Sequence, residues 1–300
     1  MLIKSVINSN DNRLSGGLPS LLEIMSKVEQ SNEDSAVIDF SDCKFITPVF
    51  ALAFKVYASR CGRDIFMRNI TDYMKKIGFK DGGIKPDRLR RSEFVAILEG
   101  YSRKTYIPIV DFPAQKHSDD KETILTAIED LIIRQSNIPL NVAIGIKYII
   151  GETIDNITEH SETDRGYIFA QSYPNKKYLD LCIADRGITL LGSYKHSGHN
   201  EIDSDVLAMK AANNGVSSKN LPKAENRGYG IITSKKMLVD GLDGQYLMMS
   251  GSAFYAYGIG HDNTFYSLPA EPANLRWNDT IIALRIPYQN FNFDYIDYIE

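Results

Sequence analysis

The hydrophobic pattern that organises the chain lies near its middle, in residues 145–161, which read GIKYIIGETIDNITEHS. At about 100° per residue, its isoleucines fall on one side of a helix and most of its acidic and amide residues on the other. On the polar side, Glu152, Asn156 and His160 are spaced four apart and line up along one face. The pattern predicts one amphipathic helix. Its polar face is either simply hydrated or able to hold a hard cation and polarise a water molecule.

The residues before this helix predict a small α/β domain, which we expect to span residues 1–114. Short apolar runs predict strands at 2–7, 36–40, 64–67 and 106–110. Helical spacing of apolar residues predicts helices at 16–29, 47–60, 72–77 and 92–101. Thr47 can cap the second of these helices, and Pro48 suits its first position. Strand, helix and strand at this spacing are typical of an α/β unit.

The rest of the chain predicts a second domain at residues 115–290 and a tail at 291–300. Its predicted strands are 166–173, 178–184, 246–249, 253–257 and 280–286. Besides the central helix, its predicted helices are 122–135, 204–212 and one that ends at 239. The polar segment 188–227 is long for a loop, which indicates a functional lid or disorder. The tail alternates aromatic and acidic residues, and we expect it to dock on its own domain.

Composition narrows the classes of function. A chain of 300 residues with 34 basic and 38 acidic side chains has a formal net charge of −4, so no general attraction to nucleic acid or anionic membranes is expected. The three cysteines are widely spaced, which argues against a disulfide framework or a zinc site. We find no apolar run of about 18 residues and no signal-peptide pattern. A cytoplasmic protein without a membrane segment is therefore expected.

Two short motifs carry candidate chemistry. Asp185 and Gly187 directly follow a predicted strand, where an aspartate can accept a hydrogen bond from an exocyclic amine and a glycine lets a flat ring approach the backbone. Gly228 and Gly230 open a predicted helix, whose free N–H groups can face an anion. Each motif alone is a common turn signal. A conventional α/β scaffold without a nucleotide therefore stays open.

Taken in order, the motifs are Glu152-x-x-Asp155-Asn156, Asp185-x-Gly187, Gly228-x-Gly230-Ile231-x-x-x-Lys235 and Asp279-Thr280. This order resembles the signature of the GHKL superfamily, which includes gyrase B, histidine kinases and mismatch-repair ATPases. The best match is to the small serine kinases that act as anti-sigma factors. The resemblance covers nearly all of residues 120–288. It implies a Bergerat-fold α/β sandwich, with a mixed sheet and helices on one face.

The resemblance also implies roles for individual residues, with ATP and Mg²⁺ as cofactors. Glu152 would be the general base, and Asn156 would hold the Mg²⁺ that bridges the phosphates. Asp185 would bind the adenine amino group, Thr280 would support it through a water, and Gly187 would leave room for the base. The second glycine box and the lid would supply the other nucleotide contacts: Gly228, Tyr229, Gly230, Ile231 and Lys219, with Lys223 as a further lid lysine. Lys235 matches a position of the family pattern, but we expect it to be a surface charge.

The chain departs from the GHKL pattern at one glycine. Thr189 stands where the first glycine box often has its second glycine, and a threonine loses backbone freedom if positive φ is needed. Two functions stay open. One is an enzyme that hydrolyses ATP or passes its γ-phosphate to a protein serine or threonine. The other is a non-catalytic regulatory module in which ATP orders the lid and controls protein–protein contacts.

The first domain carries a second resemblance, through the run AVIDFSDCKFI at residues 36–46 followed directly by a helix. It resembles the STAS family, the fold of bacterial anti-sigma-factor antagonists, over about half of the domain. Those antagonists usually carry a phosphorylatable serine at the start of this helix, where the chain has Thr47 and Pro48. The resemblance implies a STAS-like interaction domain without the usual phospho-switch. A generic α/β scaffold is the alternative.

The pairing of these two parts implies a role in bacterial signalling by partner switching. The expected partners are ATP and a regulatory protein of the sigma or anti-sigma type, with a homodimer left open. No direct nucleic-acid or membrane contact is expected.

Overall fold

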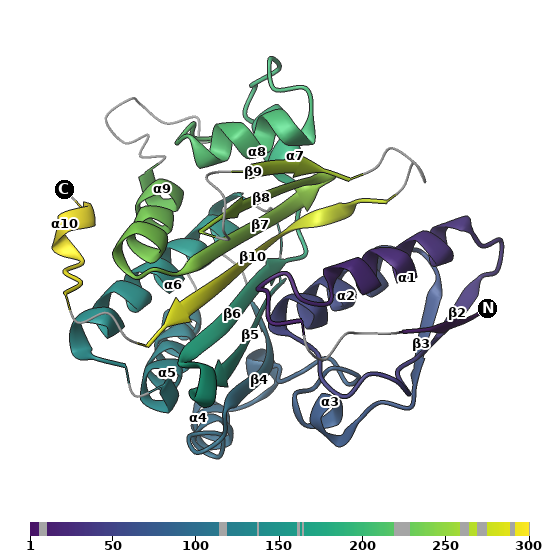
Figure 1. Cartoon of the computed structure of the whole chain (residues 1–300), viewed down its shortest axis with the longest axis horizontal. Helices are drawn as coiled ribbons and strands as arrows, with labels where there is room; N and C mark the ends of the chain where they lie inside the picture. The colour runs from purple at the N-terminus through teal and green to yellow at the C-terminus, as the bar shows by residue number, and fades with distance from the viewer. Residues whose placement is uncertain are drawn as a thin grey trace.

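The computed structural model describes residues 1–5, 11–113, 119–136, 138–160, 163, 165–218, 229–258, 264–268, 275–288 and 292–299. Within them the protein is a mixed α/β structure with a three-stranded parallel sheet and a seven-stranded antiparallel sheet. The small sheet lies toward the N-terminus and the large sheet fills the centre, with the C-terminus at the far end (Figure 1). In the described part of the chain, we find no helix with the length and apolar character needed to cross a membrane.

The small sheet has the order β1-β2-β3, formed by β1 (Leu2–Lys4), β2 (Ser35–Asp39) and β3 (Asp64–Arg68). Helices α1 (Leu18–Gln30) and α2 (Pro48–Arg60) connect its strands. The expected cap of α2 is confirmed: Thr47 Oγ1 accepts a hydrogen bond from the Phe50 N–H at 3.3 Å and donates one to the Gly16 carbonyl at 2.7 Å. The Thr47 hydroxyl thus fixes where α2 begins.

The large sheet has the order β4-β5-β6-β10-β7-β8-β9. Its strands are β4 (Tyr106–Pro113), β5 (Arg165–Tyr173), β6 (Tyr178–Asp185), β7 (Gln245–Gly251), β8 (Ala253–Tyr257), β9 (Thr264–Ser267) and β10 (Trp277–Pro287). Every strand pair in it is antiparallel, so the expectation of a mixed sheet is wrong for the described strands. Strand β9 was not predicted, because its residues, TFYS, form neither an aliphatic run nor an alternation of apolar and polar positions.

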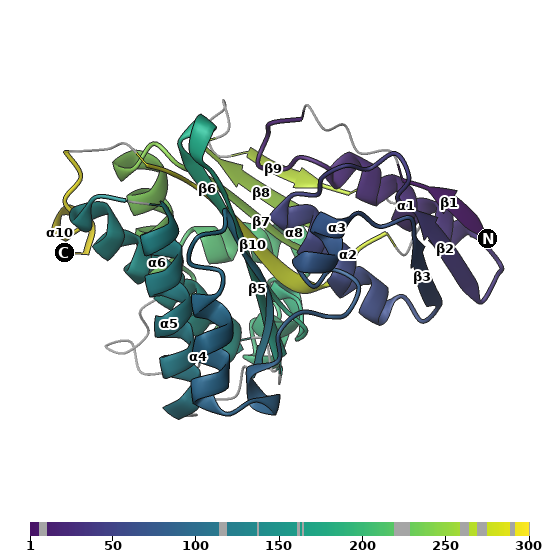
Figure 2. The ribbon, with the colours of Figure 1, turned by 90° about the horizontal axis from the view of Figure 1, so that it is seen from below.

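Helices cover both faces of the large sheet, as Figure 2 shows. One face packs against α4 (Arg91–Glu99), α5 (Asp119–Ser136), α6 (Leu140–His160) and α9 (Tyr229–Lys236). The opposite face packs against α2, which contacts β5, β6 and β10. The remaining α-helices are α3 (Asp72–Lys76), α7 (Leu190–His196), α8 (Asp205–Asn213) and α10 (Ile296–Ile299). The described chain also has the 3-10 helices η1 (Pro86–Arg88) and η2 (Pro174–Lys176) and the π-helix η3 (Met237–Gly241).

Alternation along β6 explains why both faces are buried. Leu179, Leu181 and Ile183 belong to the hydrophobic cluster with α5 and α6, whereas Cys182 and Ala184 belong to the cluster with α2. The small side chains on the second face let α2 approach the sheet closely. One continuous core therefore joins the first part of the chain to the large sheet.

The boundary at residue 114 remains a prediction. Strand β4, which precedes it in the chain, is hydrogen-bonded to β5 in the large sheet. The tail docks on its own half, as expected: Phe293 is buried and a Cβ on Gly145 would lie 2.6 Å from its ring. Glycine at 145 therefore makes room for the tail.

A buried ion pair links β6 to β10. Arg285 Nε lies 2.7 Å from Asp180 Oδ1 and Arg285 Nη2 lies 2.8 Å from Oδ2, while Arg285 Nη1 donates to the Asn12 carbonyl at 2.5 Å.

We expect Asp180→Ala to lower the free energy of unfolding by about 3–5 kcal/mol, because it leaves a buried guanidinium without its carboxylate partner. Chemical unfolding measures this. The double variant Asp180→Leu/Arg285→Met should be less destabilised than the single one, and a single-variant loss below about 1 kcal/mol would contradict the assignment.

Candidate functional site

Helices α6 and α9 bring together three of the residues singled out in the sequence. Helix α6 carries Glu152 and Asn156 one turn apart, and both side chains are half-buried. Gly230 lies against them at the start of α9: a Cβ built on it would be 2.0 Å from Glu152 Oε2 and 3.9 Å from Asn156 Nδ2. A larger residue at 230 would displace the Glu152 carboxylate. The glycine therefore serves the placement of this carboxylate beside the first turn of α9.

The carboxamide of Asn156 is oriented by its own helix. Its Nδ2 donates to the Glu152 carbonyl at 2.8 Å, which leaves Oδ1 as the atom able to bind a cation. Magnesium usually takes one or two protein oxygens and completes its shell with water and phosphate oxygens. A carboxamide oxygen one turn from a carboxylate fits that requirement. Among the described residues, no group of three or more His, Cys, Asp or Glu side chains could hold a metal ion.

Asp185 ends strand β6 and is 2% exposed. Its Oδ1 accepts hydrogen bonds from the backbone N–H groups of Gly187 at 3.0 Å and Thr280 at 3.1 Å. Burial raises the pKa of its carboxyl to about 8, although these two hydrogen bonds oppose the shift. Asp185 continues the row of Leu181 and Ile183, so it faces the side of the sheet on which α6 packs.

Thr280 and Ser250 extend this polar row across the sheet. They are paired in the register of β10 and β7, and their hydroxyl oxygens lie 3.1 Å apart. The Ser250 hydroxyl also accepts the Leu190 N–H at 2.9 Å. Thr280 therefore touches Asp185 through its backbone N–H, while its hydroxyl faces Ser250. Sequence reasoning missed Ser250, because nothing near it in the chain distinguishes it from any other serine in a strand.

The departure at Thr189 has a simple structural role. Its φ is −70° and its Oγ1 accepts the Gly192 N–H at 3.1 Å, so it is the N-cap of helix α7. No positive φ is required there, and the threonine introduces no backbone strain. Helix α7 itself was not predicted within the segment expected to form a lid. Gly187 is buried next to Asp185.

Several other predicted residues lie wholly or partly outside the described part of the chain. Gly228, Lys219 and Lys223 lie outside the described residues. For Tyr229 and His160 only the helical backbone is described. Ile231 is half-buried and packs against the hydrophobic cores on either side of α9.

Lys235 is buried, which contradicts the expectation that it would be a surface charge. Its Nζ donates to the Asn213 carbonyl at 3.0 Å and lies 4.7 Å from the Tyr255 ring centroid and 5.8 Å from that of Tyr257. Burial lowers the pKa of its ammonium to about 8. Two adjacent lysines at a helix end resemble a solvated terminus, so the local sequence gave no sign of this packing.

No protein-family model matches the chain, and comparison with curated proteins and with solved structures finds no match either.

The raised pKa of Asp185 predicts a pH-dependent stability. Between its ordinary value of 3.8 and about 8, the folded protein binds a proton that the unfolded chain releases. This contribution is complete below pH 3.8 and is lost as pH rises to about 8. We expect Asp185→Asn to raise the free energy of unfolding at pH 8 by about 2 kcal/mol, because it removes a buried charge.

Chemical unfolding of wild type and Asp185→Asn at pH 5 and pH 8 measures this effect. The advantage of the variant should grow with pH. The exposed Asp203, changed to Asn, is the matched control for the loss of one carboxylate from the surface. Parallel pH profiles for wild type and Asp185→Asn would contradict the burial of a titrating carboxyl at this position.

Proposed function

We propose that the chain is an Mg·ATP-binding protein of the GHKL class, with a Bergerat-fold nucleotide domain and a STAS-like N-terminal domain. In this proposal it hydrolyses ATP, or passes the γ-phosphate to a serine or threonine of a partner protein, in bacterial cytoplasmic signalling. The observation that carries the proposal is the meeting of Glu152, Asn156 and Gly230. The sequence motifs that contain them are far apart in the chain, yet α6 and α9 bring them into contact.

The polar row at the end of β6 supports a second part of the same nucleotide site. Asp185 lies on the face of the sheet that α6 covers, with Thr280 and Ser250 beside it. Adenine binding would lower the pKa of the Asp185 carboxyl, because a donated hydrogen bond favours its ionised form, and the carboxylate can then accept that bond from the exocyclic amine of adenine. Since the backbone N–H groups of Gly187 and Thr280 occupy Oδ1, we assign the amine to Oδ2.

The residues of α6 and α9 then divide the phosphate chemistry between them. Bound Mg·ATP supplies the γ-phosphate. The backbone N–H groups in the first turn of α9 would face its negative charge, and the helix dipole would add to that attraction. Asn156 Oδ1 would hold the cation, and the Glu152 carboxylate would accept a proton from the attacking water or hydroxyl. Gly230 keeps the Glu152 carboxylate close to this helix end.

A non-catalytic regulatory module is the second candidate. The observation that supports it is the packing of α2 on the same sheet that carries Asp185. A change in this sheet on nucleotide binding can therefore reach the first domain through α2. In this version ATP binding controls a protein–protein contact without turnover.

The first domain fits an interaction role without a phospho-switch. Its three parallel strands with connecting helices support a STAS-like arrangement. The hydroxyl of Thr47 is committed to the Phe50 N–H and the Gly16 carbonyl. Phosphorylation of Thr47 would cost both hydrogen bonds, so we expect regulation of this domain by its contacts instead.

Replacement of Glu152 separates the two candidate functions. In the catalytic version, Glu152→Gln should lower phosphate release or phosphotransfer by about 10²–10⁴-fold, the usual contribution of a general base, while Mg·ATP binding persists. Phosphate release and equilibrium binding, measured on the same samples, check this. Wild-type protein that binds Mg·ATP without releasing or transferring phosphate would favour the regulatory module. Full turnover in Glu152→Gln would contradict the assigned base.

Gly230→Ala tests the contact between α9 and Glu152. The added methyl group would meet Glu152 Oε2 at 2.0 Å, and a flexible carboxylate can move away at little cost to stability. We therefore expect turnover to fall at least tenfold while the free energy of unfolding changes by less than about 1 kcal/mol. Gly151→Ala on α6 is the control, since its Cβ would meet no atom of the described residues within 4 Å outside its own helical backbone and chain neighbours. Equal activity of the two variants would contradict the role of Gly230.

A further inference from the structure

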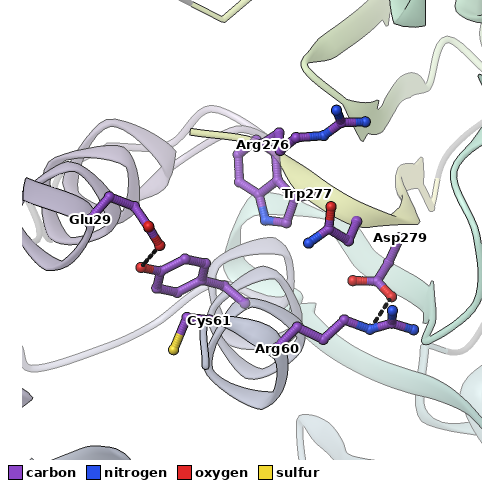
Figure 3. Close-up of a pocket in the computed structure, with 8 residues that line it drawn as sticks. Glu29, Arg60, Cys61, Arg276, Trp277 and Asp279 are labelled. Carbon is purple, nitrogen blue, oxygen red and sulfur yellow. Dashed lines mark hydrogen bonds and ion pairs between the residues drawn. The ribbon is translucent and has the colours of Figure 1, made fainter. Parts of the chain in front are cut away.

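Arg60, the last residue of α2, reaches from the first domain to the turn that follows Asp185. Its Nη2 donates to the carbonyl oxygens of Arg186 and Gly187, the latter at 3.0 Å. Its Nε lies 3.0 Å from Asp279 Oδ1, an ion pair that Figure 3 shows. The guanidinium thus joins α2 to two separate segments of the large sheet.

These contacts form a closed ring with the hydrogen bonds of Asp185. Gly187 is held on both sides, because Asp185 accepts its N–H and Arg60 binds its carbonyl. Asp279 pairs with Arg60, and the next residue, Thr280, donates its N–H to Asp185. A shift of α2 relative to the sheet therefore moves the two backbone segments that hold the Asp185 carboxylate.

The ring has room to rearrange. A cavity of about 210 Å³ lies beside Arg60, between α1, α2 and the start of β10, and the Arg60 side chain is 33% exposed. Trp277 lines this cavity, is 1% exposed, and finds no acceptor for its indole N–H among the described residues. In Figure 3 the Trp277 indole and the Arg60 side chain line the same space. The end of α2 is thus packed less tightly than its middle.

We infer that Arg60 is a positioning residue for Asp185 and couples the first domain to the nucleotide-binding site. This inference rests on the proposed function and adds a regulatory link to it. A partner that moves α2 changes the affinity for the adenine base through Arg60. A guanidinium suits this role, because its planar array of donors serves a carboxylate and two carbonyls at once, which an ammonium does less well.

The test compares nucleotides with and without the exocyclic amine. Each variant is titrated with the Mg²⁺ complex of a non-hydrolysable ATP analogue and, separately, with that of the corresponding inosine triphosphate analogue. The two titrations give two dissociation constants for each variant. Because Arg60 acts through Asp185, Arg60→Ala should weaken binding of the adenine nucleotide at least tenfold and weaken the inosine nucleotide much less. Arg60→Lys should restore part of the preference. A purely structural role would weaken both nucleotides equally.

Arg68→Ala is the matched control, since Arg68 pairs with Asp39 inside the first domain. It should leave both dissociation constants unchanged. If Arg60→Ala does not fold, Asp279→Asn removes the opposite member of the ion pair and should show the same selective loss. Wild type that binds neither nucleotide would overturn the proposed function and this inference together. Wild type that prefers adenine, with the same preference in Arg60→Ala, would overturn the inference alone.

Fluorescence of the chain's only tryptophan provides a second readout. Because Trp277 is buried beside Arg60 and two residues before Asp279, nucleotide binding should change its emission in wild type. The change should be lost in Arg60→Ala at saturating nucleotide. An identical emission change in both proteins would contradict coupling through Arg60.

Discussion

The burial of helix α2 between two sheets is the constraint on which the rest of the structure depends. Phe50 and Phe54 pack with Phe40 and Phe79 inside the first domain. On its other side the helix lies over the small residues of β6 and β10. Each fully buried large side chain contributes about 1.5–3 kcal/mol relative to exposure, so this shared core holds the two parts in one arrangement. It also fixes the place of Arg60 at the end of the helix.

The proposed nucleotide site has two parts, one between helices α6 and α9 and one at the end of strand β6. Helices α6 and α9 place a carboxylate, a carboxamide and a glycine against one another, and β6 ends at a buried aspartate in a row of polar side chains. Burying a carboxylate such as Asp185 costs stability, as its raised pKa shows. Carboxyls with raised pKa values are enriched at functional sites, which supports the proposed role of Asp185. Helix α2 of the first domain packs on the opposite face of the sheet from this aspartate.

Much of the fold followed from hydrophobic periodicity, because α6, α2 and most strands have strong patterns and recognisable ends. The pairing of Glu152 with Asn156 could be predicted, since spacing along one helix decides it. Contacts that arise from packing could not be predicted, because no residue near Arg60 or Ser250 in the sequence indicates that either lies close to Asp185. Lys235 was misassigned for the same reason, because its burial depends on tyrosines from a distant strand. The antiparallel sheet and strand β9 also depend on pairings that local sequence does not encode.

Thermal unfolding of wild type and Asp185→Asn, with and without Mg·ATP at pH 7, tests the central claim most directly. A ligand at 100 times its dissociation constant adds about 2.7 kcal/mol to the free energy of unfolding, which raises the midpoint measurably. The account predicts that Mg·ATP raises the midpoint of wild type and leaves that of Asp185→Asn unchanged. Equal shifts in both proteins, or no shift in wild type at millimolar Mg·ATP, would contradict it.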